Sequence, residues 1–468
     1  MQQEPLVYPY IPNTVPGIKA KMMQEVGITD VMQLYEEIPE NLKFHKEMQI
    51  PTPLLDEYSI KRHTDKLLNK NLNASDHLCF LGAGCAQHYA PAVCDEIAGR
   101  GEFLTAYVGE SMGDHGKWQA FFEYCSLMAE LTDMEILSIP MYDGFQAASS
   151  SLRMANRITD RFKVLVPGTI NPDMLMVIKN YLHSMTSPIE VATVNWDKNT
   201  GLMDLNDLKA KLGNNVAAVL IENPSYLGCF ESQAQEIGNL TRQAGAEFVV
   251  YTDPISLGVV EAPANYGATI TCGDFHTLGL HLGAGGCQGG FIATHDDMKY
   301  IAEFKDLMFG LTETTSKGEY GFGEVLYERT SYGSRDKGKE FTGTSTGLWA
   351  ITAGVYLSLM GPKGMQEVGT TIMQQAQYAA KKIAQIPGVQ VRLNTPFFKE
   401  FVVNFDMTGK TVAQVNKSLL QYQIFGGKDL SQEFSELGQS ALYCVTEVPA
   451  KEDLDKLAYA IQGAVSPA

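Results

Sequence analysis

Lysine is missing from a long stretch in the middle of this chain. From Leu212 to Met298 no lysine occurs, although the 468-residue sequence contains 36 lysine and arginine residues. A Schiff base forms only when a primary amine condenses with an aldehyde, so this window cannot supply the covalent anchor of a Schiff-base enzyme. The absence excludes enzymes whose catalytic lysine would lie between residues 212 and 298.

Paired cysteine motifs and long apolar runs are lacking too. None of the eight cysteines forms a C-x-x-C pair, which argues against zinc ribbons and dithiol redox motifs and predicts no metal site. We expect reduced, mostly buried thiols in a cytoplasmic protein. No apolar run approaches the roughly 20 residues of a membrane span, and residues 1–16 lack the basic and apolar regions of a signal peptide.

The charge balance excludes further classes of partner. The net charge of -18 argues against nucleic acid or an anionic membrane as the main partner. A hydrophobic content of 45% with 19% charged residues is typical of a globular protein. At this length we expect two or three lobes rather than one.

The pattern along the chain predicts four regions. Residues 1–79 indicate an arm and a helical segment, residues 80–306 a large α/β domain, residues 307–346 a long loop or connection, and residues 347–468 a small C-terminal domain. In the large domain apolar strands alternate with helices, which predicts a mostly parallel sheet covered on both faces. The expected strands are 162–166, 189–194, 216–221, 248–252 and 290–294, with 400–406 and 441–446 in the small domain.

Two of the apolar segments end in groups that could bind a ligand. The strand 248–252 is followed by Asp253, and a carboxylate in this position is the usual partner of the pyridinium nitrogen of a cofactor. A second apolar segment ends some twenty residues later in Asp274, Phe275, His276 and Thr277. His276 and Thr277 cannot form a Schiff base, so the chain has the layout of a cofactor enzyme without its amine.

Asp143 stands where a helix is expected to begin. The N-terminal amides of such a helix could bind a cofactor phosphate, but a carboxylate at the same place repels a second anion. We therefore favour a role for Asp143 as the helix cap. The segments 82–84 and 283–286 resemble phosphate loops only loosely, and a tight turn or close packing is the favoured interpretation.

Five other residues are candidates for contact with a small molecule. Asn223 follows a buried strand and precedes Pro224, which is consistent with turn chemistry or with a ligand contact. His88 lies at the expected start of a helix and could equally be a structural histidine. Tyr107, Glu110 and His115 share a glycine-bearing loop that could be a solvated loop or the edge of a site.

Four ordered segments carry a resemblance to a known family. They are 10–14 (YIPNT), 253–258 (DPISLG), 354–364 (GVYLSLMGPKG) and 426–430 (GGKDL). Together they are similar to the glycine dehydrogenase (decarboxylating) subunit 1 family, the α half of the glycine cleavage P-protein. The likeness spans nearly the whole chain, so it is far more specific than any single motif.

The resemblance implies an aminotransferase-like fold type I protein, with a large mostly parallel-sheet domain and a smaller α+β domain. It implies a homologous β subunit that carries pyridoxal phosphate on its own lysine, with no cofactor bound covalently to this chain. The αβ enzyme would decarboxylate glycine and pass the aminomethyl group to the lipoyl arm of the H protein. We then expect Tyr107, Glu110, His115, His88 and Asn223 to edge the substrate site, and Asp143, Asp253 and His276 to line a vestigial cofactor pocket.

One loop departs from the family pattern. The family's stretch T-A-Y-T-P-Y-Q-P-E-I-S-Q-G is replaced by the shorter sequence 105–116, in which only Tyr107 remains of the aromatic residues. This change leaves open a divergent paralogue that acts on another small amine or amino acid. A noncatalytic scaffold subunit is the second alternative. A free-standing enzyme that uses Lys337 or Lys339 is the third, and it is disfavoured because a mobile loop positions a nucleophile poorly.

Overall fold

The computed structural model describes residues 7–8, 10–46, 48–104, 115–183, 187–283, 289–340 and 345–466. The chain divides into two compact units, Met1–Asn71 and Leu72–Ala468. The first unit is therefore shorter than the predicted segment 1–79. Residues 78–79 belong to the second unit because β1 (Leu78–Cys79) pairs in parallel with β13 (Ile424–Phe425).

The first unit consists of short helices. They include α1 (Pro16–Val26) and α2 (Glu57–Leu68), with 3-10 turns in the segment between them. Gly27 ends α1 with φ +79°, a left-handed conformation that favours glycine, and the Asp56 side chain caps α2 by accepting a hydrogen bond from the Ser59 amide. None of the described residues of this unit is buried.

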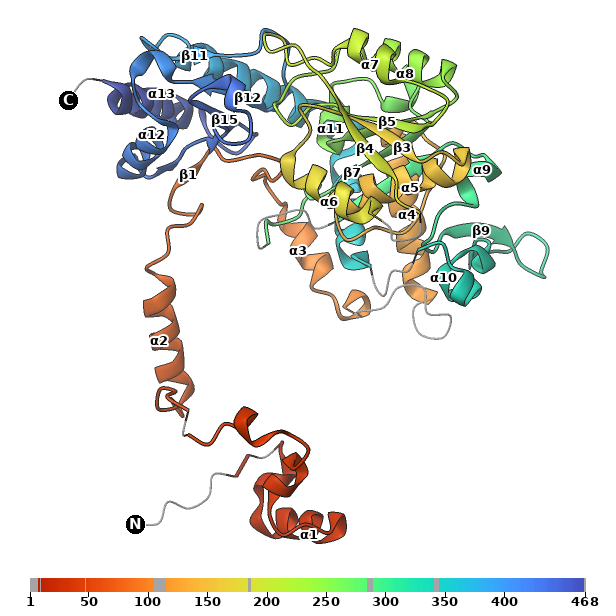
Figure 1. The fold of residues 1–468 in the computed structure, drawn as a ribbon, viewed down its shortest axis with the longest axis vertical. Coiled ribbons are helices and arrows are strands. Elements are labelled where there is room, and N and C mark those ends of the chain that lie inside the picture. The colour runs from red at the N-terminus through yellow and green to blue at the C-terminus, as the bar shows by residue number, and fades with distance from the viewer. Residues whose placement is uncertain are drawn as a thin grey trace. The chain divides into compact units, whose positions relative to one another are not determined.

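The second unit contains a seven-stranded sheet in the order β2-β8-β7-β6-β5-β3-β4. Figure 1 labels its strands β3, β4, β5 and β7 among the helices of the large domain. The neighbours from β7 to β4 run parallel, whereas β8 is antiparallel to both β7 and β2. The predicted mostly parallel sheet is confirmed. The strands are β2 (Ile136–Leu137), β3 (Lys163–Pro167), β4 (Glu190–Val194), β5 (Val216–Glu222), β6 (Glu247–Thr252), β7 (Ile270–Asp274) and β8 (Gly290–Thr294).

Successive strand residues enter different apolar layers, because side chains alternate across a strand. Val219 and Val250 pack with residues of α4, α8 and the long helix α11 (Gly347–Ile383), whereas Leu220 and Val249 pack with residues of α5 and α6. Both faces of the sheet are thus covered by helices. Besides α11, the helices of the large domain are α3 (Ala92–Ala98), α4 (His115–Thr132), α5 (Gly144–Thr159), α6 (Pro172–Leu182), α7 (Leu205–Lys211), α8 (Ala234–Gln243) and α9 (Met298–Ile301).

The region 307–346, expected to be a long loop, contains regular structure. Strands β9 (Phe309–Glu313) and β10 (Tyr320–Glu324) form an antiparallel hairpin, and α10 (Ser331–Ser334) follows. The Phe309 ring packs against Trp118 and Phe121 of α4, so aromatic packing stabilises a segment whose glycine and charge content suggested a loop.

A buried ion-pair network holds the end of this region. The carboxylate of Glu340 accepts hydrogen bonds from Arg157 at 2.7 Å and from the Tyr181 hydroxyl at 2.6 Å. The neighbouring Lys339 amine pairs with Glu303 at 2.6 Å. Lys339 is therefore engaged in a structural contact, which weakens the alternative of a free-standing enzyme that uses it as a nucleophile.

The small domain follows a long helix that connects the two parts of the second unit. Helix α11 (Gly347–Ile383) is interrupted at Gly361, whose φ is +57°, and Pro362 follows this break. A four-stranded sheet in the order β11-β12-β15-β14 packs with the last two helices. The elements are β11 (Gln390–Val391), β12 (Glu400–Asn404), α12 (Val412–Leu419), β14 (Lys428–Asp429), β15 (Ser440–Cys444) and α13 (Lys451–Val465). None of the helices in the described ranges has the length and apolarity needed to cross a bilayer.

Candidate functional site

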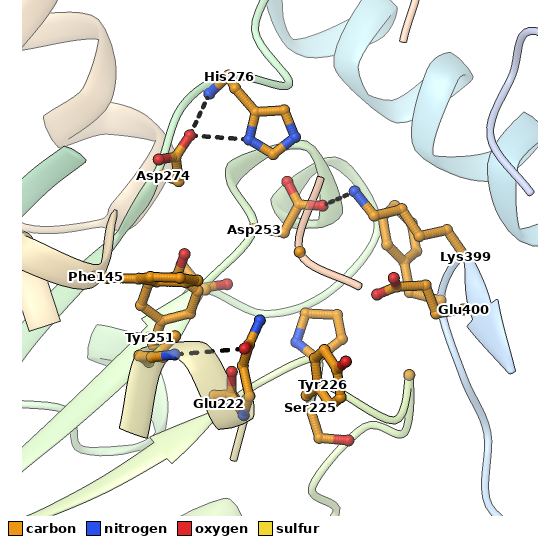
Figure 2. Close-up of a pocket in the computed structure, with 17 residues that line it drawn as sticks. Phe145, Glu222, Ser225, Tyr226, Tyr251, Asp253, Asp274, His276, Lys399 and Glu400 are labelled. Carbon is orange, nitrogen blue, oxygen red and sulfur yellow. Dashed lines mark hydrogen bonds and ion pairs between the residues drawn. The ribbon is translucent and has the colours of Figure 1, made fainter. Parts of the chain in front are cut away.

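Three acidic side chains meet at the carboxyl edge of the large sheet. Glu222 ends β5, Asp253 follows β6 and Asp274 ends β7, and all three line one cavity. Ligands of open α/β sheets bind at this edge because the carboxyl ends of parallel strands lie together there. Figure 2 shows that Lys399 and Glu400 approach the same space from the start of β12, in the small domain.

An ion pair occupies the position expected for a cofactor nitrogen. The Lys399 amine lies 2.5 Å from one carboxylate oxygen of Asp253 (Figure 2). The Thr277 hydroxyl donates to the other oxygen at 3.0 Å. Burial alone would lower the pKa of Lys399, but attraction to Asp253 raises it above its usual value. Lys399 is therefore held protonated and carries no lone pair with which to attack an aldehyde.

His88 extends this contact as a structural histidine. Its Nε2 lies 3.2 Å from the Lys399 amine and its Nδ1 lies 2.8 Å from Glu447. Burial, followed by the nearby charge of Lys399, lowers the pKa of His88, so the neutral ring donates to Glu447 and accepts from Lys399. His88 does not lie at the start of a helix as expected, because α3 begins only at Ala92.

At the N-terminus of α5, where a phosphate could bind, carboxylates already accept hydrogen bonds from the helix amides. Asp143 is the helix cap and accepts a hydrogen bond from the Gln146 amide at 2.7 Å. Asp274 accepts from the Gly144 amide at 2.9 Å and from Nδ1 of His276 at 2.8 Å. A phosphate here would face two carboxylates, which repel it.

The sequence-predicted candidates divide into three groups. Asp253 and His276 line the cavity, and Asp143 lies beside it on α5. The Asn223 side chain instead accepts from the Glu231 amide at 3.1 Å and donates to the Tyr266 hydroxyl at 3.3 Å, so it is bonded within the chain. Tyr107 and Glu110 lie outside the described residues, and so does the side chain of His115, whose backbone begins α4.

Three contributors to the site were not identified from the sequence. They are Glu222, Lys399 and Glu400, and Lys399 contradicts the expectation that no amine lies near His276. The amine comes from the small domain, 146 residues after Asp253. A charged Lys-Glu pair at the head of a predicted strand was the available signal, but nothing in the sequence relates this pair to Asp253.

The cavity does not fit pyridoxal phosphate. Its volume is about 60 Å³, whereas small-molecule sites usually measure roughly 300–1,000 Å³. The carboxylate that a pyridinium nitrogen would need is bound to Lys399, and the helix amides that a phosphate would need are bound to Asp143 and Asp274. Among the described residues, no cluster of three His, Cys, Asp or Glu side chains could hold a metal ion.

Solved structures with similar folds support the architecture. A sphingosine-1-phosphate lyase from Burkholderia pseudomallei matches 92% of this chain and 94% of its own, with a TM-score of 0.64 at 15% identity. A NifS-like protein from Rickettsia africae matches 83% and 99%, with a TM-score of 0.61 at 13% identity. The chain therefore has the fold type I architecture of pyridoxal-phosphate-dependent proteins, as the resemblance implied.

Sequence relatives and a further structure identify the family. The family profile described as "Glycine cleavage system P-protein" matches residues 10–461. Proteins named probable glycine dehydrogenase (decarboxylating) subunit 1 are 35% identical in Staphylothermus marinus (96% of this chain and 97% of theirs) and 34% identical in Pyrococcus furiosus (97% and 98%). An inhibitor-bound glycine decarboxylase (P-protein) of the glycine cleavage system has a TM-score of 0.83 at 30% identity, covering 98% of this chain and 100% of its own. The chain belongs to the glycine cleavage system P-protein family.

Proposed function

We propose that this chain is subunit 1 of a two-subunit glycine dehydrogenase (decarboxylating), and that it completes an active site whose pyridoxal phosphate is carried by subunit 2. The observation that carries this proposal is the ion pair between Lys399 and Asp253. This pair occupies both the Lys399 amine in the cavity and the Asp253 carboxylate that would bind the cofactor nitrogen. The names of the relatives, which are subunit 1 proteins, support the existence of a second subunit.

The contribution of this chain to substrate binding would come from the loop at residues 105–116. His88 and Asn223 are bonded within the chain, so their contacts do not require a substrate. Tyr107, Glu110 and His115 remain as candidates for the edge of the partner's site. The substrate would be glycine, and the aminomethyl group would pass to the lipoyl H protein.

A cytoplasmic location is part of this proposal. The seven cysteines in the described residues are all free thiols, as expected in a reducing compartment. Burial raises the pKa of several of them, including Cys125 to about 12, so these thiols are poor nucleophiles and are expected to serve as packing groups.

Cofactor mapping tests the division of labour between the subunits. The chain would be co-expressed with its subunit 2, saturated with pyridoxal phosphate, reduced with borohydride and digested for peptide mapping. We expect one stoichiometric adduct on a lysine of subunit 2 and an unmodified Lys399 peptide. A stoichiometric adduct on Lys399, or on any other lysine of this chain, would refute the proposal.

A second experiment separates a catalytic contribution from a scaffold role. Tyr107→Ala should lower the rate of glycine decarboxylation by the complex without changing its assembly, measured by size exclusion. Tyr459→Ala on α13 is the matched control, since Tyr459 is exposed and outside the loop. Equal activity of both variants in an intact complex would favour the scaffold alternative.

A further inference from the structure

A cleft lies along the second half of α11, beside the small domain. Gln374, Gln377 and Lys381 line it from one face of the helix, since residues three or four positions apart are neighbours on a helix surface. The chain turns back after Ile383 and β11 contacts α11, so the segment 391–397 forms the second wall. The cleft measures about 1020 Å³, which is at the upper end of the roughly 300–1,000 Å³ typical of ligand sites.

The charged side chains that line this cleft are all positive. They are Lys381 and Arg392, and no aspartate or glutamate is among the described residues of the lining. Neither cation forms an ion pair with a described carboxylate, whereas the neighbouring Lys382 pairs with Asp455 at 3.1 Å. Because acidic residues outnumber basic ones by 54 to 36 in the whole chain, a cleft without acids differs from the average composition and should attract anions.

One carboxylate lies near Arg392 without lining the cleft. Hydrogen bonds from Asn404 and from the Gln439 amide, and to a lesser degree the charge of Arg392, lower the pKa of Asp406. The two carboxylate oxygens of Asp406 accept from Nδ2 of Asn404 at 2.8 Å and from the Gln439 amide at 2.9 Å. The guanidinium donors of Arg392 therefore remain available to a ligand.

Neutral amide side chains complete the polar lining. They are Gln374 and Gln377 on the helix, Asn394 on the second wall, and Asn199 in a neighbouring turn whose carbonyl accepts from the Asn394 amide at 2.7 Å. None of these four side chains bonds to another residue in the described ranges. A primary amide both donates and accepts hydrogen bonds, so the four groups match the donor and acceptor of a peptide bond.

The second wall also presents an open backbone edge. Strand β11 is the terminal strand of its sheet, with β12 as its one neighbour among the described strands. The Arg392 amide donates to the Val402 carbonyl at 2.8 Å, and alternate residues of an antiparallel strand face its partner, so the backbone groups of Val391 face away from β12. The Leu393 amide has no hydrogen bond to a described residue, although Leu393 is only 9% exposed. Such an edge is a template for the addition of another strand.

We propose that this cleft docks an extended acidic peptide segment of a partner protein, with carboxylates at Lys381 and Arg392 and the peptide backbone along the edge of β11. From Gln374 to Ala384 the helix rises about 15 Å at about 1.5 Å per residue. About five extended residues at roughly 3.3 Å each cover that length. An extended ligand reaches both cations and the amides along the cleft, whereas a compact anion such as phosphate leaves most of the volume unfilled.

Synthetic peptides test the charge and the backbone requirement separately. The full chain, together with subunit 2 where the two copurify, would be titrated by calorimetry with a blocked pentapeptide that alternates glutamate and valine. We expect saturable binding, at least tenfold weaker binding when glutamine replaces glutamate or when the backbone nitrogens are methylated, and no binding when lysine replaces glutamate.

Three results of these titrations would overturn the proposal. Equal affinity of the methylated peptide would show that no strand is added to β11. Inorganic phosphate or a nucleoside triphosphate that binds as tightly as the glutamate peptide would show a general anion site. Absence of binding at millimolar peptide would show that the cleft does not select an acidic segment.

Matched variants locate the binding site. Lys381→Gln and Arg392→Gln should each weaken binding of the glutamate peptide about fivefold or more, whereas Lys417→Gln, at an exposed position of α12, should change it less than twofold. The wild-type protein provides a second measurement that does not depend on the folding of a variant. A photoreactive version of the glutamate peptide should crosslink to residues 374–384 or 391–397. Undiminished binding by both variants, or crosslinks confined to other segments, would refute the assignment.

Discussion

The two ends of the pocket are closed in opposite ways. At one end a carboxylate, Asp253, is neutralised by the amine of Lys399 from the small domain. At the other end two carboxylates, Asp143 and Asp274, satisfy the amides at the start of α5 within the large domain. The first closure joins two domains through a buried charge pair, while the second is local. Breaking the Lys399–Asp253 ion pair should therefore lower the free energy of unfolding more than removing the local closure. It should also affect the contact between the large and small domains.

The largest effect is expected at the end that joins the domains. Lys399→Met leaves Asp253 buried without its cation, and loss of one partner of a buried pair costs about 3–5 kcal/mol. Urea unfolding measures this loss, and Lys381→Met, at an exposed position of α11, should change stability by less than about 0.5 kcal/mol. Adding Asp253→Asn to Lys399→Met should recover part of the loss. Equal effects of the Lys399 and Lys381 substitutions would show that the ion pair contributes little.

Glu222, between the two ends of the pocket, should make the stability of the protein depend on pH. Its pKa is raised from 4.5 to about 8 by burial, so the folded state retains a proton that the unfolded state loses. This contribution to stability is fully present below pH 4.5 and is lost progressively as the pH rises toward 8. The wild type should lose about 2–3 kcal/mol between pH 5 and pH 7 from this group. Glu222→Gln should remove that slope, whereas Glu96→Gln should keep it; an unchanged slope in Glu222→Gln would contradict the assignment.

The loop at residues 105–116 should affect catalysis rather than stability. Anionic Glu110 would oppose binding of a substrate carboxylate by up to roughly 3 kcal/mol at a separation of about 6 Å and an effective dielectric of about 20. We expect weak exchange of the glycine carboxyl group with bicarbonate in the reconstituted complex, and a gain from Glu110→Gln that exceeds that of the exposed control Glu135→Gln. Robust exchange that neither substitution alters would show that the loop change is neutral for glycine.

The smallest effect is expected at the local closure. Asp143→Ala removes the cap of α5 and should cost about 0.5–2 kcal/mol, whereas Asp143→Asn retains a side-chain acceptor and should cost less. Chemical unfolding of the two variants at pH 7 measures both. A loss in Asp143→Ala that exceeds the loss in Lys399→Met would reverse the comparison between the ends.

The sheet could be predicted from the sequence, and the closure of the pocket could not. Strands β5 and β6 are continuous apolar runs because both faces of a parallel sheet are buried. Such runs can be recognised in the amino-acid sequence alone. Asp253 was identifiable because the acid directly follows such a run. Its partner Lys399 lies 146 residues away in another domain, and no local pattern encodes that contact. Strands β9 and β10 were missed for a related reason, since they are stabilised by aromatic contacts with α4 rather than by their own composition.

The first unit has a consequence for how a cell must handle this protein. Its described residues include no buried side chain, and Leu42, Ile50 and Leu55 are 70%, 69% and 78% exposed. Exposed apolar side chains of this kind are typical of a surface that a partner covers. If subunit 2 covers these side chains, as the proposed function implies, production of this chain without subunit 2 should increase its degradation or aggregation.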